Sequence, residues 1–192
     1  NELEISLGLN PTLVDSDEDG ISDALEDHDG DGLSNIDEVL HGTDLALADT
    51  DGDGLSDGDE VNLHNTDPTL SDSDGDRIPD GLEIDAGLDP NDALSNNVAA
   101  YVTALTVTPP QTTIIQGSVL ELQLNVQATV ELNGNTYQID VTEDSYGTVY
   151  ASSNAAVASH TADGLYQISG TGDTVLTATL GTVSGTASLT VQ

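Results

Sequence analysis

The two halves of the chain differ in how their apolar residues are spaced. After about residue 100, apolar and polar residues alternate over short stretches, most clearly in residues 119–128, where the apolar residues at even positions would share one face. A period of two is typical of a strand with one buried face. Similar stretches cover residues 103–108, 136–141, 148–152, 165–169, 175–180 and 186–191. About seven short strands, with Asn133-Gly134 as the clearest hairpin turn, predict an antiparallel β-sandwich.

The first half holds few apolar residues between its acidic runs. Three linking segments, residues 39–44, 61–68 and 84–90, each begin with an apolar residue and end in Gly or Asn with Asp close behind. These endings are helix-stop signals, so each segment predicts one or two helical turns and excludes a long helix. No single repeat has enough apolar residues to bury a core of its own. The order of this half must therefore come from another source.

The acidic runs repeat one motif of twelve positions, starting at residues 15, 27, 49 and 72. In residues 49–60, oxygen-bearing side chains stand at positions 1, 3, 5 and 9, glycine stands at position 6, and Glu60 stands at position 12. Position 7 is apolar in every copy, and its backbone carbonyl offers a further oxygen. Calcium takes six to eight oxygens, and a chain supplies them when alternate residues turn inward around a flexible central residue.

This motif predicts four calcium sites with six ligand positions each. The predicted ligands are Asp15, Asp17, Asp19, the Ile21 carbonyl, Asp23 and Glu26 in the first loop; Asp27, Asp29, Asp31, the Leu33 carbonyl, Asn35 and Glu38 in the second; Asp49, Asp51, Asp53, the Leu55 carbonyl, Asp57 and Glu60 in the third; and Asp72, Asp74, Asp76, the Ile78 carbonyl, Asp80 and Glu83 in the fourth. Agreement in four copies is far stronger than one match. A solvated acidic tail or a run of Asp-Gly turns would not require an apolar position 7 and Glu at position 12 each time.

Composition divides the chain at the same place and predicts two domains, residues 1–96 and 97–192. Residues 1–92 hold 29 of the 36 Asp and Glu residues, and Arg77 is the single basic residue of the chain. A net charge of −35 makes nucleic acid and anionic membranes poor partners. No apolar run is long enough to cross a bilayer, so membrane insertion is not expected. Self-repulsion opposes a compact first half without metal, so calcium is expected to be a condition of its folding.

Several individual residues carry their own expectations. Arg77 occupies position 6 of the fourth loop, where the other loops have glycine, so it is expected to be left-handed at a cost of about 1 to 2 kcal/mol and to weaken that site. Alignment of residues 3–11 with 82–90 makes Glu4 the last ligand of a further loop and predicts a piece of a longer exported protein. Four residues close the linking segments and could either cap a turn or reach a neighbouring ion: Asn10, Asp44, Asp67 and Asp89. Four histidines lack zinc-like spacing and are expected to be solvated: His28, His41, His64 and His160.

The acidic half resembles thrombospondin type 3 repeats in the form found in exported bacterial proteins, through the four loops and the Gly-Thr-Asp and Asn-Thr-Asp-Pro links. The second half is similar to a bacterial Ig-like domain of group 2. The matching pieces are residues 105–109, Gly117, residues 150–154 with Val157 and Ala158, and residues 163–165 and 172–178. Tyr150 stands where that family usually has tryptophan, and it can fill the slot if its hydroxyl finds a partner. The resemblance implies non-catalytic spacers, stalks and adhesive regions of surface proteins and secreted hydrolases.

These observations predict a calcium-rigidified spacer or adhesion segment of a larger exported bacterial protein, located outside the cell or on its surface, where calcium is abundant. Expected partners are calcium, neighbouring domains of the parent protein, and a surface protein or carbohydrate receptor. The alternative is a non-catalytic accessory module, or a dockerin-like docking module, of a secreted hydrolase. Catalysis is not expected, because the clustered carboxylates are committed to the loops and the second half has one histidine, His160.

Overall fold

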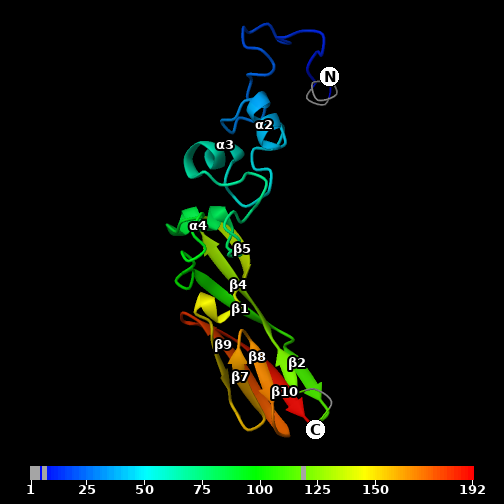
Figure 1. The fold of residues 1–192 in the computed structure, drawn as a ribbon, viewed down its shortest axis with the longest axis vertical. Coiled ribbons are helices and arrows are strands. Elements are labelled where there is room, and N and C mark those ends of the chain that lie inside the picture. The colour runs from blue at the N-terminus through cyan, green and yellow to red at the C-terminus, as the bar shows by residue number, and fades with distance from the viewer. Residues whose placement is uncertain (1–4, 6–7, 118–119) are drawn as a thin grey trace. The chain divides into compact units, whose positions relative to one another are not determined.

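The computed structural model describes residue 5, residues 8–117 and residues 120–192 (Figure 1). The chain divides into two compact units, Asn1–Ile84 with Asp89–Leu94, and Asp85–Leu88 with Ser95–Gln192. The predicted domain boundary between residues 96 and 97 stays a prediction. Glu4 lies outside the described residues. Among the described residues, no helix is long and apolar enough to cross a membrane.

Short helices begin within the second, third and fourth acidic loops and run into the linking segments. They are α2 (Asn35–His41), α3 (Asp57–Asp59) with the π-helical turn η1 (Glu60–His64), and α4 (Asp80–Ala86). The Ser34 and Ser56 side chains cap α2 and α3 by accepting backbone N–H bonds. The left-handed residues Gly42 and Asn65 follow α2 and η1. The expectation of one or two helical turns per linking segment is therefore confirmed, with each helix beginning at position 9 of its loop.

The second unit is built from strands in three hydrogen-bonded sheets. The strands are β1 (Val102–Thr108), β2 (Gln111–Ile114), β3 (Glu121–Gln123), β4 (Asn125–Leu132), β5 (Asn135–Asp140), β6 (Val149–Ser152), β7 (Ala158–Ala162), β8 (Leu165–Ile168), β9 (Gly172–Leu180) and β10 (Val183–Val191). Their orders are β1-β4-β5, β2-β10-β9-β6 and β3-β8-β7. All pairs are antiparallel except β2 with β10, which run parallel.

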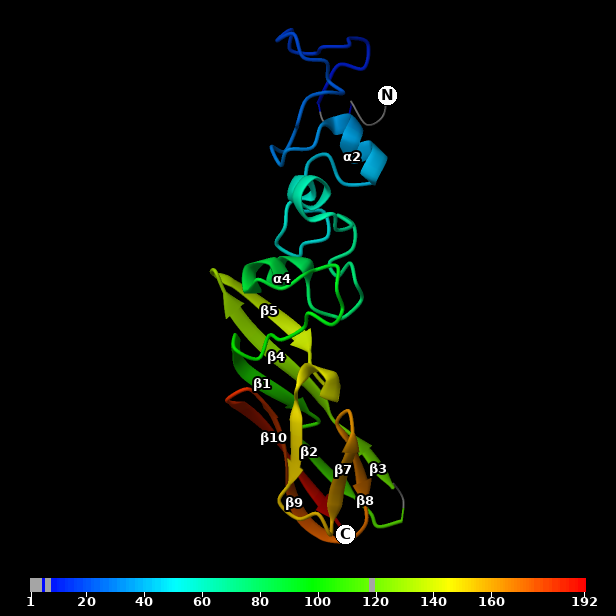
Figure 2. The same cartoon turned by 60° about the vertical axis from the view of Figure 1, so that its left-hand side comes forward.

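The strand order is that of an immunoglobulin-like sandwich. Strands β3, β8 and β7 pair as the B, E and D strands of that fold do, and β6, β9 and β10 pair as its C, F and G strands. Figure 2 shows β3, β8 and β7 side by side. The predicted antiparallel sandwich is thus confirmed. A short 3-10 turn, η2 (Asp144–Tyr146), lies between β5 and β6.

The strand predictions needed three corrections. The predicted strand over residues 119–128 is divided at Leu124 into β3 and β4, and its expected inward residue Leu120 is 65% exposed. Strands β2 and β7 were missed, because their short and mostly polar sequences show no apolar alternation. The hairpin turn at Asn133-Gly134 is confirmed, since both residues have positive φ and β4 pairs with β5 across them.

Two tyrosines organise the sandwich core. Tyr166 is fully buried, and its hydroxyl donates to the Ala151 carbonyl at 2.9 Å. The Tyr150 hydroxyl donates to the Thr142 carbonyl at 2.6 Å, so the partner expected for this residue is present. His160 stacks on Tyr150 with ring centroids 4.6 Å apart, and 21% of its side chain is exposed. The expectation that His160 is solvated was therefore wrong, because a stacking partner on a neighbouring strand is not visible in its sequence spacing.

Candidate metal centres

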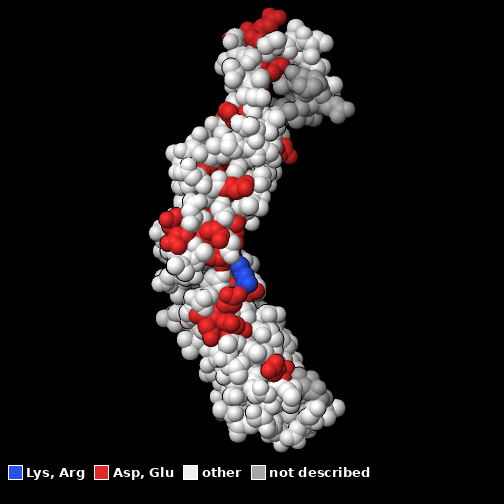
Figure 3. Space-filling view, in the orientation of Figure 1, with Lys and Arg blue, Asp and Glu red and all other residues white. Residues whose placement is uncertain are grey.

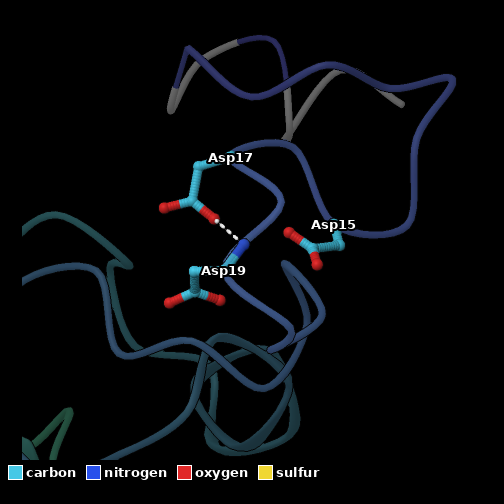
Figure 4. A group of neighbouring side chains, drawn as sticks. All are labelled: Asp15, Asp17 and Asp19. Atoms are coloured by element: carbon cyan, nitrogen blue, oxygen red, sulfur yellow. Dashed lines mark hydrogen bonds between the residues drawn. The ribbon is translucent and has the colours of Figure 1, made fainter.

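Each acidic loop brings three carboxylates together. The carboxylates at positions 1, 3 and 5 offer oxygens within 4.8 Å of one another. These groups are Asp15, Asp17 and Asp19; Asp27, Asp29 and Asp31; Asp49, Asp51 and Asp53; and Asp72, Asp74 and Asp76. Figure 4 shows the first of them gathered around one turn of the chain. Oxygens bound to one calcium ion lie at most about 5 Å apart, so each group is compact enough to share an ion.

Backbone amides hold these carboxylates in place. In the third loop, Asp49 accepts N–H bonds from Gly52 at 2.7 Å and Gly54 at 3.1 Å, which are positions 4 and 6. Asp51 accepts from the amide of Asp53, and Asp53 accepts from the amide of Leu55. The same pattern recurs in the other loops. The loop thus fixes both oxygens of the position 1 carboxylate, and one oxygen of the carboxylates at positions 3 and 5.

The bonds to position 1 require a left-handed backbone at two places in every loop. Position 6 has φ of 97° to 103° in the three loops with glycine and 74° at Arg77, so the left-handed conformation expected for Arg77 is confirmed. Position 4 is also left-handed, with φ of 80° to 84° in three glycines and 64° at Glu18. The sequence analysis missed the requirement at position 4. Its signal was present, because three of the four loops have glycine there.

In the second, third and fourth loops the glutamate at position 12 is buried without sufficient partners, whereas Glu26 of the first loop is half-buried. Glu38, Glu60 and Glu83 are fully buried. Both carboxylate oxygens of Glu38 and Glu83, and one of Glu60, have no hydrogen-bond partner. The other oxygen of Glu60 accepts a bond from the Thr66 hydroxyl at 3.1 Å. Buried polar groups are almost always hydrogen-bonded, so these oxygens fit a bound cation.

The electrostatics of position 12 agree with that fit. Burial, followed by the nearby aspartates, raises the pKa of Glu38 to about 7 and that of Glu83 to about 9. Burial and neighbouring aspartates raise the pKa of Glu60 to about 8, against the lowering effect of its bond from Thr66. Each of these glutamates lies among carboxylates of its own loop, and a dication at the shared centre would reverse the sign of that interaction.

The side chain at position 9 is held in place by the residue at position 2, which the sequence analysis did not single out. Asp57 is fully buried and accepts bonds from the Thr50 amide at 2.8 Å and the Thr50 hydroxyl at 2.6 Å. Position 2 is Ser or Thr in each loop with Asp at position 9, and each makes the amide bond. In the second loop the Asn35 amide group donates to the Asp23 carbonyl at 2.6 Å, while its own oxygen is buried without a partner. That free amide oxygen fits the ligand role predicted for Asn35.

The residues that close the linking segments cap turns. The Asp44 carboxylate accepts from the amide of Ala46, and the Asp67 carboxylate accepts from the amide and hydroxyl of Thr69. Asn10 and Asp89 accept in the same way from the residue two places on. Of the two alternatives for these residues, these hydrogen bonds support turn capping.

The first loop is more open than the others. Its position 7 side chain, Ile21, is 48% exposed, whereas Ile78 in the fourth loop is completely buried. Asp17 and Asp19 are exposed, and residues 23–26 form a turn instead of a helix. The ligand residues alone could not reveal this openness, because the first loop has the same ligand residue types at positions 1, 3, 5, 9 and 12 as the third and fourth loops. What differs is how much neighbouring chain covers each loop.

Two substitutions separate backbone strain from charge as determinants of affinity. Arg77→Gly removes a strained residue and a positive charge, while Glu18→Gly removes a strained residue and a negative charge. If strain dominates, both variants should bind calcium about threefold to tenfold more tightly in their own loop, since a left-handed residue with a β-carbon costs about 1 kcal/mol or more. Calorimetric titration with calcium measures this. A gain for Arg77→Gly together with a loss for Glu18→Gly would show that charge dominates instead.

Comparison with known proteins identifies the acidic half. No curated protein matches the chain. A solved structure titled "Biofilm associated protein - BSP domain" matches with 20% sequence identity and a TM-score of 0.23, over 87% of this chain and 23% of that one. The chain therefore spans about a quarter of that structure's length. The family model described as the bacterial TSP3 repeat matches residues 15–27, 27–44, 49–71 and 72–93. The four acidic loops, with the linking segments that follow them, thus match the model of the bacterial TSP3 repeat, a repeat of a calcium-binding type.

Proposed function

We propose that residues 15–93 bind four calcium ions, one in each loop, and that these ions turn the segment into a rigid spacer within a larger exported bacterial protein. The observation that carries the proposal is the buried glutamate at position 12. Glu38, Glu60 and Glu83 are each fully buried beside three aspartates, and each has at least one oxygen without a hydrogen-bond partner. A bound dication supplies the missing partner and neutralises part of the charge.

Calcium fits these loops better than magnesium or zinc. The ligands are oxygens from carboxylates, one amide and backbone carbonyls, and each loop offers at least six of them. Magnesium prefers a smaller octahedral shell that keeps several waters, and zinc prefers nitrogen and sulfur. The chain has no cysteine, and its histidines stand outside the ligand positions. Calcium at the millimolar concentrations found outside cells suits sites of this kind.

A spacer also agrees with the rest of the molecule. Figure 3 shows acidic side chains at several places on the surface that it draws, which disfavours nucleic acid and anionic membranes as partners. The sandwich unit is immunoglobulin-like, an architecture common in cell-surface proteins. We infer that the chain lies outside the cell or on its surface. Its proposed partners are neighbouring domains of the parent protein and a surface protein or carbohydrate receptor.

The single arginine provides a direct test of calcium-dependent order. Trypsin cleaves after Lys and Arg, so it can cut this chain only after Arg77. The Ile78 side chain is fully buried, and its amide donates to Asp76, so a folded fourth loop should resist cleavage. We expect no cleavage in millimolar calcium and rapid cleavage in chelator. An unstructured arginine peptide in both reactions controls for trypsin activity.

Metal analysis and scattering complete the test. Mass spectrometry under native conditions should show four calcium ions per chain, and small-angle scattering should show a smaller radius of gyration in calcium than in chelator. Equal cleavage and equal scattering in the two conditions would refute the spacer mechanism. If the chain binds calcium but its radius of gyration does not change, the proposed calcium sites stand and the proposed role as a rigid spacer is refuted.

A further inference from the structure

Successive loops are joined through a calcium ligand. The Asp31 carboxylate, at position 5 of the second loop, accepts an N–H bond from Gly58 at 2.6 Å. The Asp53 carboxylate, at position 5 of the third loop, accepts an N–H bond from Gly81 at 2.9 Å. Gly58 and Gly81 both occupy position 10 of the loop that follows. The same contact therefore occurs at two successive steps of the repeat.

Only glycine permits this approach of one loop to the next. A β-carbon on Gly81 would lie 2.5 Å from the backbone carbonyl oxygen of Asp53, and one on Gly58 would lie closer still to that of Asp31. Real β-carbons essentially never come so near to a backbone atom. Both glycines have ordinary backbone conformations, since neither has a positive φ. The absence of a side chain at position 10 thus serves the contact and not a turn.

The step from the first loop to the second is built differently. Position 10 of the second loop is Ile36, and its amide donates to the Ala24 carbonyl at 2.9 Å instead of to a carboxylate. The Asn35 side chain also donates to the first loop, but its acceptor is the Asp23 backbone carbonyl, so that bond joins two neutral groups and is weaker than a bond to a carboxylate. The corresponding ligand of the first loop, Asp19, is exposed. The second loop follows the first without a linking segment, which leaves no chain to bring position 10 over that carboxylate.

We propose that the amides of Gly58 and Gly81 position a calcium ligand of the preceding loop, so that the second, third and fourth loops bind calcium as one coupled unit that excludes the first. This rests on the proposed function, because it requires calcium in the loops. When the third loop is ordered, the Gly58 amide lies against the Asp31 carboxylate and holds it in place. The second loop then loses less conformational entropy when it binds calcium, so its calcium affinity is higher. By thermodynamic reciprocity, an ion in the second loop favours the third equally.

The sign of the effect separates this coupling from simple charge repulsion. Two calcium ions in neighbouring loops repel each other, so uncoupled loops should bind more tightly when their neighbour is empty. Coupled loops should bind more weakly when their neighbour is empty, because the positioning bond is lost. A hydrogen bond to a charged group is strong enough to change affinity by about tenfold.

The test follows each loop separately in the full chain. The amides of position 6, Gly20, Gly32, Gly54 and Arg77, each bond the position 1 carboxylate of their own loop and can report its occupancy. Nitrogen-15 NMR during a calcium titration gives a midpoint for each. In Glu60→Gln, which weakens the third site, the Gly32 and Arg77 amides should need about tenfold more calcium, while Gly20 should stay within about twofold. Unchanged or lower midpoints for Gly32 and Arg77 would overturn the coupling, as would an equal shift of Gly20.

A second variant leaves every ligand side chain in place. Gly58→Ala should raise the calcium midpoints of both Gly32 and Gly54, whereas the matched change Ile36→Ala at position 10 of the second loop should leave Gly20 unmoved. A folded Gly58→Ala chain with wild-type midpoints would refute the role of this amide, and Glu60→Gln remains decisive if Gly58→Ala does not fold. If no wild-type amide responds up to about 10 mM calcium, the proposed function fails, and the coupling fails with it.

Discussion

Removal of calcium should abolish the cooperative unfolding of the acidic repeats and leave that of the sandwich unchanged. Of the buried apolar side chains among the described residues, the repeats contribute only Leu33, Leu45, Leu55, Ile78 and Leu82. So small a core cannot offset the chain entropy of about 80 residues together with their mutual charge repulsion. Calorimetry in millimolar calcium should show two transitions, and calorimetry in excess chelator should show one.

The surviving transition should belong to the sandwich. Its core draws buried residues from several strands, among them β4 and β9, and among the described residues it includes no carboxylate cluster. A fragment covering residues 95–192 provides the control, and its transition should coincide with the one that remains in chelator. If the repeats still unfold cooperatively without calcium, their hydrogen-bonded turns alone would have to stabilise them. That result would contradict the argument from charge and core size.

Glu83→Gln should have opposite effects in the presence and absence of calcium. With calcium, loss of a charged ligand should weaken the fourth site on the order of 100-fold, since ligand charge is a main determinant of calcium affinity. Without calcium, the same change should favour the folded loop, because it replaces a buried carboxylate that lacks partners. Burial, with help from Asp76, raises the pKa of Glu83 to about 9, above its ordinary 4.5, so the ion-free fold loses stability as the pH rises between these values.

Two measurements test the effects of Glu83→Gln on calcium affinity and on the stability of the ion-free fold. The calcium midpoint of the Arg77 amide reports the affinity of the fourth site. In chelator, the concentration of trimethylamine oxide needed to fold the repeats reports the ion-free stability, and it should fall by an amount equivalent to about 1 to 3 kcal/mol. Glu18→Gln removes the same charge from an exposed position that is not a predicted ligand, and it should change neither value. A higher osmolyte requirement for Glu83→Gln would mean that the carboxylate stabilises the fold without an ion.

The sequence predicted the acidic loops well because their ligand chemistry is local. Spacing alone placed Asp49, Asp51 and Asp53 around one point, and the structure gathers these carboxylates within 4.8 Å. The strain at Arg77 was also predicted, since the bend at position 6 follows from the loop itself. The ligand assignments at all six positions stay predictions, and the buried glutamates support those at position 12.

Contacts between repeats could not be predicted in the same way. Nothing in the local sequence distinguishes Gly58 from the other glycines of the loops, and its contact is with Asp31, which lies 27 residues earlier in the chain. The hydroxyl of Thr50 was similarly overlooked, although it fixes Asp57 seven residues later. The sandwich strands β2 and β7 were missed for a related reason. Their pairing is determined by neighbouring strands and not by an apolar pattern of their own.

The parallel pairing of β2 with β10 determines how the sandwich responds to tension. Residues 111–114 pair in register with residues 188–191, close to the C-terminal end of the unit. A pull along the chain draws the start of β2 and the end of β10 in opposite directions, which loads the bonds between these parallel strands together in shear. Bonds loaded together must break together, whereas the hairpin of β4 and β5 would open one bond at a time. A pull on the two ends of the sandwich is therefore expected to meet more resistance from this strand pair than from the hairpin.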